Sequence, residues 1–300
     1  MEDTYNRKKT TSGKENRIQY IRQEEPGYPK RLRFHRGMPG GLYVLGRLPE
    51  EDRPSVAIVG ARRSDSYGNA VARRFARELA EEGVQIISGM AWGIDGMAHE
   101  GALEAGGDTF AVLGCGVDIC YPAGHKNLYE RILRQGGVLS EQPPGMAPLA
   151  GHFPARNRII SGLSDLVLVV EARERSGSLI TADFALEQGK DIFAIPGRVG
   201  DTLSQGCLNL IRQGAGVADS PQIILEALGL VGRKNREPDK ILLAKDENIV
   251  YSWIRLQPIS LEELVQKTKM PAGKVLKVLV ELELKGCVRE IQKNDYIRTD

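Results

Sequence analysis

Residues 152–160, with the sequence HFPARNRII, combine an aromatic side chain with two arginines at the predicted start of a helix. Backbone N–H groups at a helix start are unpaired and carry partial positive charge, and arginine adds bidentate donors for phosphate oxygens. Phe153 offers a flat surface on which any nucleobase can stack. The combination is typical of a site that holds phosphate and stacks a base. The structural alternative is that Phe153 fills a core while Arg156 and Arg158 pair with surface acids.

Strands and helices alternate along the centre of the chain. Apolar runs predict strands at 55–60, 84–88, 109–113, 137–140, 166–171 and 191–195. Helical patterns lie between and after them at 69–82, 95–105, 126–134, 156–163, 179–188 and 204–213. This order predicts an α/β fold, an extended Rossmann-like doubly wound parallel sheet, because crossover helices must cover both of its faces.

Glycine, serine and arginine follow several of the predicted strands. The first strand is followed by Gly60, Arg62 and Arg63, the second ends in Ser88 and Gly89, and a later one is followed by Ser176 and Gly177. Ligands of such sheets bind outside the carboxyl ends of the strands. Glycine lets an oxyanion approach the backbone, and serine and arginine donate hydrogen bonds to it. These residues therefore predict an anion cleft at one edge of the sheet.

Motifs for catalysis or cofactor binding are missing from the sequence. The first strand end does not fit GxGxxG, and no Walker A, GxSxG or HExxH motif occurs. The four cysteines, Cys115, Cys120, Cys207 and Cys287, show no zinc-ligand spacing. The sequence therefore predicts a binding groove in a protein that is not an enzyme and uses neither a cofactor nor a metal.

Two acidic residues leave alternatives open. Asp95 and His99 lie four residues apart on a predicted helix, which fits a metal or acid–base pair, but Asp95 as a helix cap is favoured. Glu171 at a strand end is either catalytic or paired with Arg173 or another arginine of the cleft.

Charge is distributed unevenly along the chain. Lys and Arg outnumber Asp and Glu by 10 to 5 over residues 1–37, fall below them at 20 to 24 over 38–238, and nearly match them at 11 to 10 over 239–300. A negative central unit cannot attract nucleic acid by its overall field, so binding there requires a local cluster of cations. No uninterrupted apolar run is long enough to cross a membrane and the start is polar, which favours a cytoplasmic protein without membrane contact.

Four segments are predicted from these patterns. Residues 1–37 form a basic, partly disordered N-terminal segment, which passes into an irregular lead-in over 18–46. The Rossmann-like DNA-binding domain covers 38–230, and a charged linker covers 231–240. Residues 241–300 read as three helices and a hairpin, a winged-helix-like domain. Its Lys269, Lys274 and Lys277 could touch DNA, but the near-neutral charge fits a protein-contacting role equally well.

Several ordered motifs over about residues 40–228 closely resemble the DNA-processing protein A family (DprA, also called Smf). They are IVGAR at 58–62, SGMAWGID at 88–95, YP at 121–122, FPARNRII at 153–160, SGSLITA at 176–182 and PG at 196–197. The winged tail also fits the C-terminal module of that family.

The resemblance implies a bacterial cytoplasmic protein that binds single-stranded DNA and helps to load the recombinase RecA during natural transformation or recombination. It also implies a homodimer formed through the Rossmann-like domain. Residues 209–212 with the segment up to Leu228 are candidates for self-association, and a helix that packs on the core explains them equally well. Carried over by motif, the strand pocket contains Gly60, Arg62, Ser88, Gly89, Phe153, Arg156, Asn157 and Arg158. Many relatives have a lysine three residues before the phenylalanine, where this chain has Ala150.

Two other functions remain open from the sequence. A nucleotide-processing enzyme of the phosphoribohydrolase type shares a Rossmann-like cleft, but Phe184 stands here in place of its required glutamate. A winged-helix transcriptional regulator would instead prefer one duplex sequence sharply.

Overall fold

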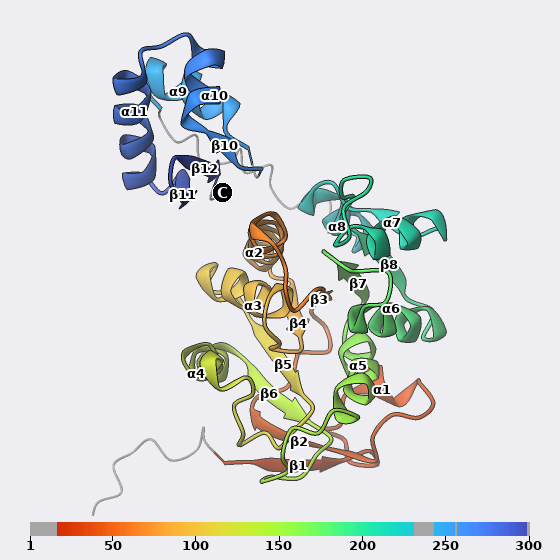
Figure 1. Cartoon of the computed structure of the whole chain (residues 1–300). Helices are drawn as coiled ribbons and strands as arrows, with labels where there is room; N and C mark the ends of the chain where they lie inside the picture. Colours follow the sequence, from red (N-terminus) through yellow and green to blue (C-terminus); the bar gives the residue numbers. More distant parts are fainter. Residues whose placement is uncertain (1–16, 231–242, 256, 299–300) are drawn as a thin grey trace, which may run out of the picture.

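The computed structural model describes residues 17–230, 243–255 and 257–298, which form a large α/β unit and a small helical unit (Figure 1). The strands of the large unit are β1 (Gln19–Arg22), β2 (Gly41–Gly46), β3 (Ser55–Val59), β4 (Gln85–Ser88), β5 (Thr109–Leu113), β6 (Gly137–Ser140), β7 (Leu166–Val169), β8 (Asp191–Ala194) and β9 (Gly216–Val217). Its helices are α1 (Lys30–Arg33), α2 (Ser66–Glu81), α3 (Ile94–Glu104), the 3₁₀ turn η1 (Ala123–His125), α4 (Lys126–Gln135), α5 (His152–Leu163), α6 (Gly177–Glu187), α7 (Gln205–Arg212) and α8 (Pro221–Ala227).

All nine strands form one sheet in the order β1-β2-β6-β5-β4-β3-β7-β8-β9. From β6 to β9 every neighbouring pair is parallel, which confirms the predicted Rossmann-like sheet. The chain runs outward in one direction from β3 to β4, and in the other from β7 to β8. The strand order therefore reverses between β3 and β7, which is where ligands bind in open α/β sheets.

The predicted irregular lead-in over 18–46 was wrong. β1 and β2 pair as antiparallel strands, and β2 pairs antiparallel with β6, so they give the parallel sheet an antiparallel margin. β1 and α1, which lie before the predicted boundary at residue 38, belong to the sheet unit. β1 is mostly exposed and therefore lacks an apolar pattern. β2, with the sequence GLYVLG, is a mostly buried apolar run, which the prolines and glycines around it obscure. The predicted disorder before residue 17 and the linker over 231–240 lie outside the described residues.

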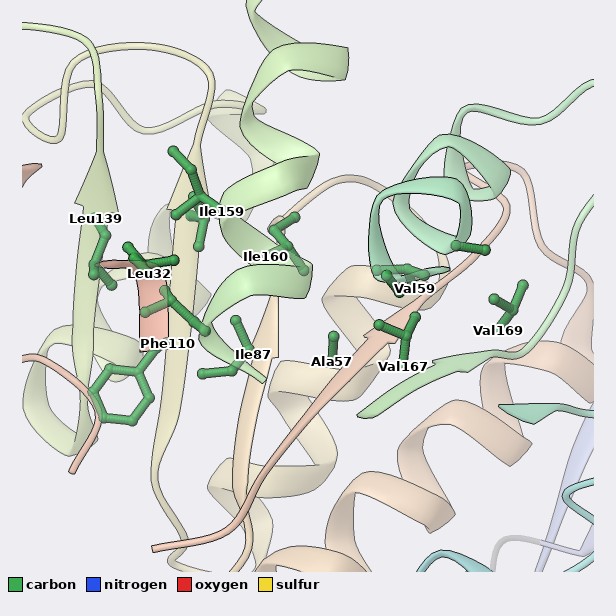
Figure 2. Packing of buried hydrophobic residues seen from close by; sticks show 14 of the residues in the cluster. Leu32, Ala57, Val59, Ile87, Phe110, Leu139, Ile159, Ile160, Val167 and Val169 are labelled. Atoms are coloured by element: carbon green, nitrogen blue, oxygen red, sulfur yellow. The ribbon is translucent and has the colours of Figure 1, made fainter. Parts of the chain in front are cut away.

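Apolar side chains cover both faces of the sheet, as its parallel strands require. Along β3, Ala57 and Val59 face one core together with Phe110, Ile160 and Val167 (Figure 2). The alternate residues of β3 face a second core beneath α2, α3 and α8. Because β3 is buried on both faces, the cleft at its carboxyl end is built on a rigid base.

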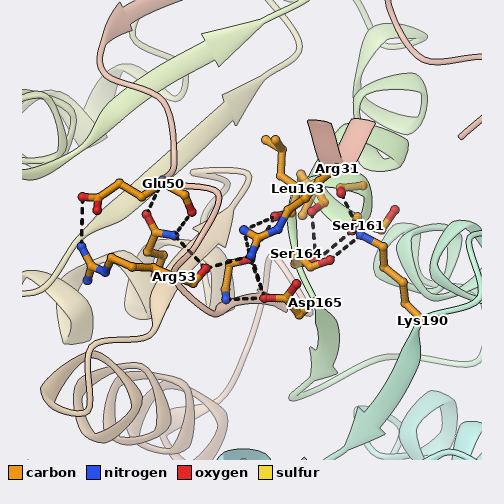
Figure 3. Close-up of polar contacts among 12 residues, drawn as sticks. Arg31, Glu50, Arg53, Ser161, Leu163, Ser164, Asp165 and Lys190 are labelled. Atoms are coloured by element: carbon orange, nitrogen blue, oxygen red, sulfur yellow. Dashed lines mark hydrogen bonds and ion pairs between the residues drawn. The ribbon is translucent and has the colours of Figure 1, made fainter. Parts of the chain in front are cut away.

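A polar cluster fixes the amino ends of β3 and β7 (Figure 3). Arg31 of α1 donates to Ser55 Oγ at 2.9 Å, to the Arg53 carbonyl at 2.8 Å and to Asp165 Oδ2 at 3.1 Å. Lys190 Nζ donates to the carbonyls of Ser161, at 2.6 Å, and of Ser164 at the end of α5. Such cations satisfy the carbonyls that a helix end leaves unpaired.

The small unit confirms the predicted winged helix. It contains α9 (Lys245–Trp253), β10 (Ile259–Ser260), α10 (Leu261–Thr268), α11 (Ala272–Leu284), β11 (Val288–Gln292) and β12 (Asp295–Arg298). Ser260 caps α10, its hydroxyl accepting from the Glu263 amide at 3.2 Å, as the sequence indicates. Among the helices of the described ranges, none has the length and apolar character that crossing a membrane requires.

Candidate nucleic-acid interface

A cleft of about 350 Å³ opens at the reversal point between β3 and β7. Four segments line it: residues 59–63 at the end of β3, Ala91 and Asp95 after β4, the start of α5 from Phe153, and residues from 173 to 181 around the start of α6. Because parallel strands end at the same edge of the sheet, the folding of β3 beside β7 brings these segments together. The cleft is therefore a product of the topology rather than of one local motif.

Four exposed arginines line this cleft: Arg62, Arg63, Arg173 and Arg175. None of them forms an ion pair with a carboxylate anywhere in the described ranges, whereas the guanidiniums of Arg47 and Arg53 share Asp108. A guanidinium with no protein partner keeps its donors free for bidentate binding of a phosphate. The cleft thus concentrates cations in a unit whose overall charge is negative.

Phe153 lies half-buried among these cations. The guanidinium carbon of Arg62 is 5.3 Å from the centre of the Phe153 ring, within the range of a cation–π contact. The ring of Tyr121 packs on Phe153 with 5.4 Å between the two centres. A nucleobase can stack on the phenyl ring or on the guanidinium that covers it, since both are flat. The aromatic and cationic groups are therefore close enough to hold one nucleotide.

The start of α6 adds backbone donors to the cleft. Ser176 is the N-cap, and its hydroxyl accepts from the Ser178 amide at 3.4 Å. Ser176, Gly177 and Ser178 all line the cleft. The N-terminus of this 11-residue helix therefore faces the same space as the arginines, and it favours an anion there.

Arg156 also lines the cleft, but its guanidinium is buried and already bonded. It is 5% exposed, donates to the Gly89 carbonyl at 2.8 Å and to the Val112 carbonyl, and lies 3.9 Å from the Asp95 carboxylate. Burial lowers the pKa of Arg156 to about 10, an effect that the charge of Asp95 opposes. Arg156 ties α5 to the ends of β4 and β5, so the geometry gives it a structural role in place of the expected direct phosphate contact.

Ser88 and Gly89 do not line the cleft. The Ser88 hydroxyl is buried and donates to the Ile58 carbonyl at 2.6 Å. A Cβ at Gly89 would lie 2.2 Å from Nη2 of Arg156. Glycine is thus required at this position by a neighbouring side chain rather than by an approaching anion.

Arg158 points away from the cleft. Its Nη2 donates to both carboxylate oxygens of Glu141 at 2.8 Å, and its Nε donates to the Gly37 carbonyl at 2.8 Å. The structural alternative from the sequence therefore holds for Arg158. Asn157, by contrast, lines the cleft, where its amide donates to the Gly177 carbonyl at 3.1 Å and links α5 to α6.

Asp95 and His99 do not act as a pair. Asp95 lies in the first turn of α3, whose N-cap is Gly93, so the predicted capping role was wrong. The carboxylate is buried and faces Arg156 instead. His99 Nδ1 contacts Thr109 Oγ1 at 2.6 Å, and burial lowers the pKa of His99 to about 3, so its ring is neutral. No cluster of three or more potential metal ligands occurs in the described part of the chain.

Glu171 matches neither of its two predicted roles. It is buried beside α2, accepts from the Asp65 amide at 3.3 Å and does not line the cleft. It forms no ion pair with an arginine of the described ranges, because Arg173 points into the cleft. Burial, as the larger cause, and the nearby carboxylate of Asp65 together raise the pKa of Glu171 to about 8.

Eight of the eleven predicted site residues thus line the cleft: Gly60, Arg62, Arg63, Phe153, Arg156, Asn157, Ser176 and Gly177. Sequence reasoning missed Arg173 and Arg175 as site residues. A usable signal was available, since both follow the predicted strand over 166–171 just as Arg62 and Arg63 follow the strand over 55–60.

The lysines of the winged unit are mostly engaged within it. Lys274 lies 2.7 Å from Asp246, and Lys277 lies 3.9 Å from Glu281. Leu276, Val280 and Leu284, spaced four residues apart on α11, are exposed. A helix that reads DNA would present cations or polar donors at such positions, so this face fits a protein contact better.

Models of known protein families match both units of the chain. The DNA recombination-mediator protein A family matches residues 19–229, and the DprA winged helix domain matches 234–291. Protein Smf of Synechocystis sp. is 35% identical and aligns with 91% of this chain and 78% of its own length. Protein Smf of Escherichia coli is 40% identical, with 90% and 75% covered.

Two solved structures share the fold. DNA processing protein A from Streptococcus pneumoniae superposes with a TM-score of 0.66 at 42% identity, over 71% of this chain and 75% of that one. DNA processing protein A from Helicobacter pylori, whose structure is described as revealing a single-stranded DNA binding mode, gives a TM-score of 0.63 at 34% identity. That match covers 70% of this chain and 96% of the other.

Proposed function

Because this chain belongs to the DNA recombination-mediator protein A family, we propose that it binds single-stranded DNA in the cleft between β3 and β7. The observation that carries the proposal is a group of four arginines that have no carboxylate partner in the described ranges and line the same cleft as Phe153, with Arg62 over its ring. Phosphates bind Arg62, Arg63, Arg173 and Arg175 and the amides at the start of α6, and a base stacks at Phe153.

Sequence preference is expected to be weak. Most of the donors that line the cleft are guanidiniums and backbone amides, which suit phosphate, and stacking on Phe153 accepts every base. Asn157 is the lining amide side chain, and it is already bonded to Gly177 and Arg156. The chain therefore binds the backbone of unpaired DNA rather than a particular base order.

Phe153→Ala tests this proposal. It should weaken binding of oligothymidine by about 1–3 kcal/mol, the contribution of one stacked base. Fluorescence anisotropy of a labelled oligonucleotide measures the affinity. Phe34→Ala is the matched control, because Phe34 is 83% exposed and lies outside the cleft. Equal affinities of the two variants would show that no base stacks on Phe153.

Catalysis is not part of the proposal. Of the described residues that line the cleft, none is a histidine or a cysteine, and the lining carboxylate of Asp95 is held by Arg156. Phe184, which takes the place of the glutamate of phosphoribohydrolases, is half-buried in α6. Release of free base from a nucleoside monophosphate would support that rival function, and a sharp preference for one duplex sequence would support a regulator.

We also propose three properties that the family membership suggests: a cytoplasmic location, loading of the RecA recombinase onto the bound strand, and a homodimer formed through the Rossmann-like unit. The edge strand β9 with its exposed Val217, and α7 beside it, offer a surface for self-association. Light scattering over a dilution series tests the dimer. Strand-exchange assays with RecA and a single-strand-binding competitor test the loading.

A further inference from the structure

Two large aromatic side chains outside the cleft are exposed along the same edge of the sheet. Trp92 follows β4 and is 52% exposed, and Tyr121 lies between β5 and η1 and is 42% exposed. β4 pairs with β3, and β5 pairs with β4, so the segments after these strands continue the edge that begins at the cleft. Exposed aromatic surface that adjoins a candidate site marks a contact surface more often than single scattered residues do.

Contacts connect these side chains to Phe153. The rings of Tyr121 and Phe153 are 5.4 Å apart between centres. A Cβ at Gly124 would lie 2.5 Å from Cη2 of Trp92, so the indole covers the backbone of η1, three residues beyond Tyr121. Phe153 and Tyr121 are thus in direct contact, and Trp92 covers the turn that follows Tyr121.

The Trp92 indole is held in place rather than free in solvent. His125 packs edge-on against it with 4.2 Å between ring centres, and His125 Nδ1 is 3.0 Å from the Met90 carbonyl. Gly93, with φ of +76°, leaves no room for a side chain, because a Cβ there would lie 2.3 Å from the Ala61 carbonyl. The loop that carries Trp92 is thus packed against the loop after β3 that carries Arg62. A fixed aromatic ring loses little entropy when a base stacks on it.

A free cation lies next to this surface. Lys126 begins α4 directly after η1, is exposed, and forms no ion pair with any described carboxylate. Aromatic rings that alternate with cations are the composition of surfaces that follow single strands without sequence preference.

We propose that the strand held in the arginine cleft continues over Tyr121 to Trp92, where further bases stack, with Lys126 as a phosphate contact. This inference rests on the proposed function, because the strand enters the path from Phe153. It assigns a binding role to Trp92, Tyr121 and Lys126, none of which is among the site residues predicted from the sequence.

Intrinsic fluorescence gives a direct test, because the chain has only two tryptophans, Trp92 and Trp253. Trp253 lies in α9 of the winged unit, so Trp253→Phe leaves Trp92 as the single indole. Titration of this variant with oligothymidine of about 16 nucleotides should quench its emission, with the same midpoint as the anisotropy of the labelled oligonucleotide. Binding by anisotropy without a change in emission would overturn the inference and leave the proposed function intact.

Oligonucleotide length gives the second test. Trp92→Ala should lower the affinity for about 16 nucleotides by about five- to tenfold and leave that for about 4 nucleotides unchanged, whereas Phe153→Ala lowers both. Trp92→Phe should restore most of the loss, which a merely structural change would not predict. Tyr20→Ala is the control, since Tyr20 is 47% exposed and lies on β1, away from the cleft. Equal effects of Trp92→Ala at both lengths would overturn the path, and absence of any binding would overturn both proposals.

Discussion

The two ends of the central sheet both collect cationic side chains, and they use them differently. At the amino ends of β3 and β7, Arg31 and Lys190 donate to carbonyls and to the Asp165 carboxylate (Figure 3). At the carboxyl ends, the exposed arginines of the cleft have no such partners among the described residues. Cations that the protein satisfies stabilise the fold, and cations that it leaves unsatisfied are available to a ligand.

Arg156 is an exception, because it lies at the carboxyl ends of the strands and yet has protein partners for its guanidinium. Arg156→Ala should lower the free energy of unfolding by about 3–5 kcal/mol, since it leaves the buried Asp95 carboxylate without its cationic partner. Arg62→Ala should change it by no more than about 0.5 kcal/mol, because Arg62 is exposed. Urea unfolding followed by circular dichroism measures both. Similar losses in the two variants would erase the distinction between structural and ligand-binding arginines.

The arginines of the cleft should dominate the salt dependence of DNA binding. The double variant Arg62→Ala with Arg175→Ala should reduce the slope of log affinity against log salt by about 1.4, or about 0.7 for each lost phosphate contact. Arg47→Ala with Arg53→Ala is the matched control, because these arginines pair with Asp108. The comparison of the two sheet ends fails if the control pair lowers the slope as much as the cleft pair.

The pH dependence of the free energy of unfolding tests the role of Glu171, which is buried near the carboxyl end of β7 and does not line the cleft. Its pKa in the folded state, about 8, lies above the ordinary value of 4.5. Between these pH values Glu171 is therefore protonated in the folded state and ionised in the unfolded state. The stability that this group contributes is therefore present below about pH 4.5 and is lost as pH rises toward 8. Glu171→Gln should remove this fall, which urea unfolding at pH 5 and pH 8 can measure. A fall in the variant as large as in the unmodified protein would contradict this role.

The smallest effect is expected from adding a cation. Ala150 is exposed just before α5, at the position where the family resemblance predicts a lysine. Ala150→Lys should raise the salt slope by about 0.7 and tighten binding modestly at low salt. Ala150→Gln controls for side-chain length, and identical slopes for the two variants would show that this position lies off the path of the strand.

The sequence predicts the regular elements well and the roles of individual polar residues less well. The strands at 109–113 and 137–140 have the predicted bounds, because buried parallel strands are continuous apolar runs. The antiparallel margin of β1 and β2 escapes detection, since it joins the sheet through the pairing of β2 with β6, far along the chain. Arg158 and Gly89 resemble ligand contacts in sequence, but Glu141 and Arg156, which are distant in sequence from them, determine what they do. Local patterns cannot reveal which charged groups find a partner when the chain folds.

The position of the cleft has a mechanical consequence. β3 and β7 are neighbours in the sheet, but more than a hundred residues separate them along the chain. A strand of DNA that contacts Arg62 after β3 and Arg175 after β7 would link these two strands at their carboxyl ends. Bound DNA should therefore stabilise the pairing of β3 with β7, and hydrogen exchange should slow in both strands together.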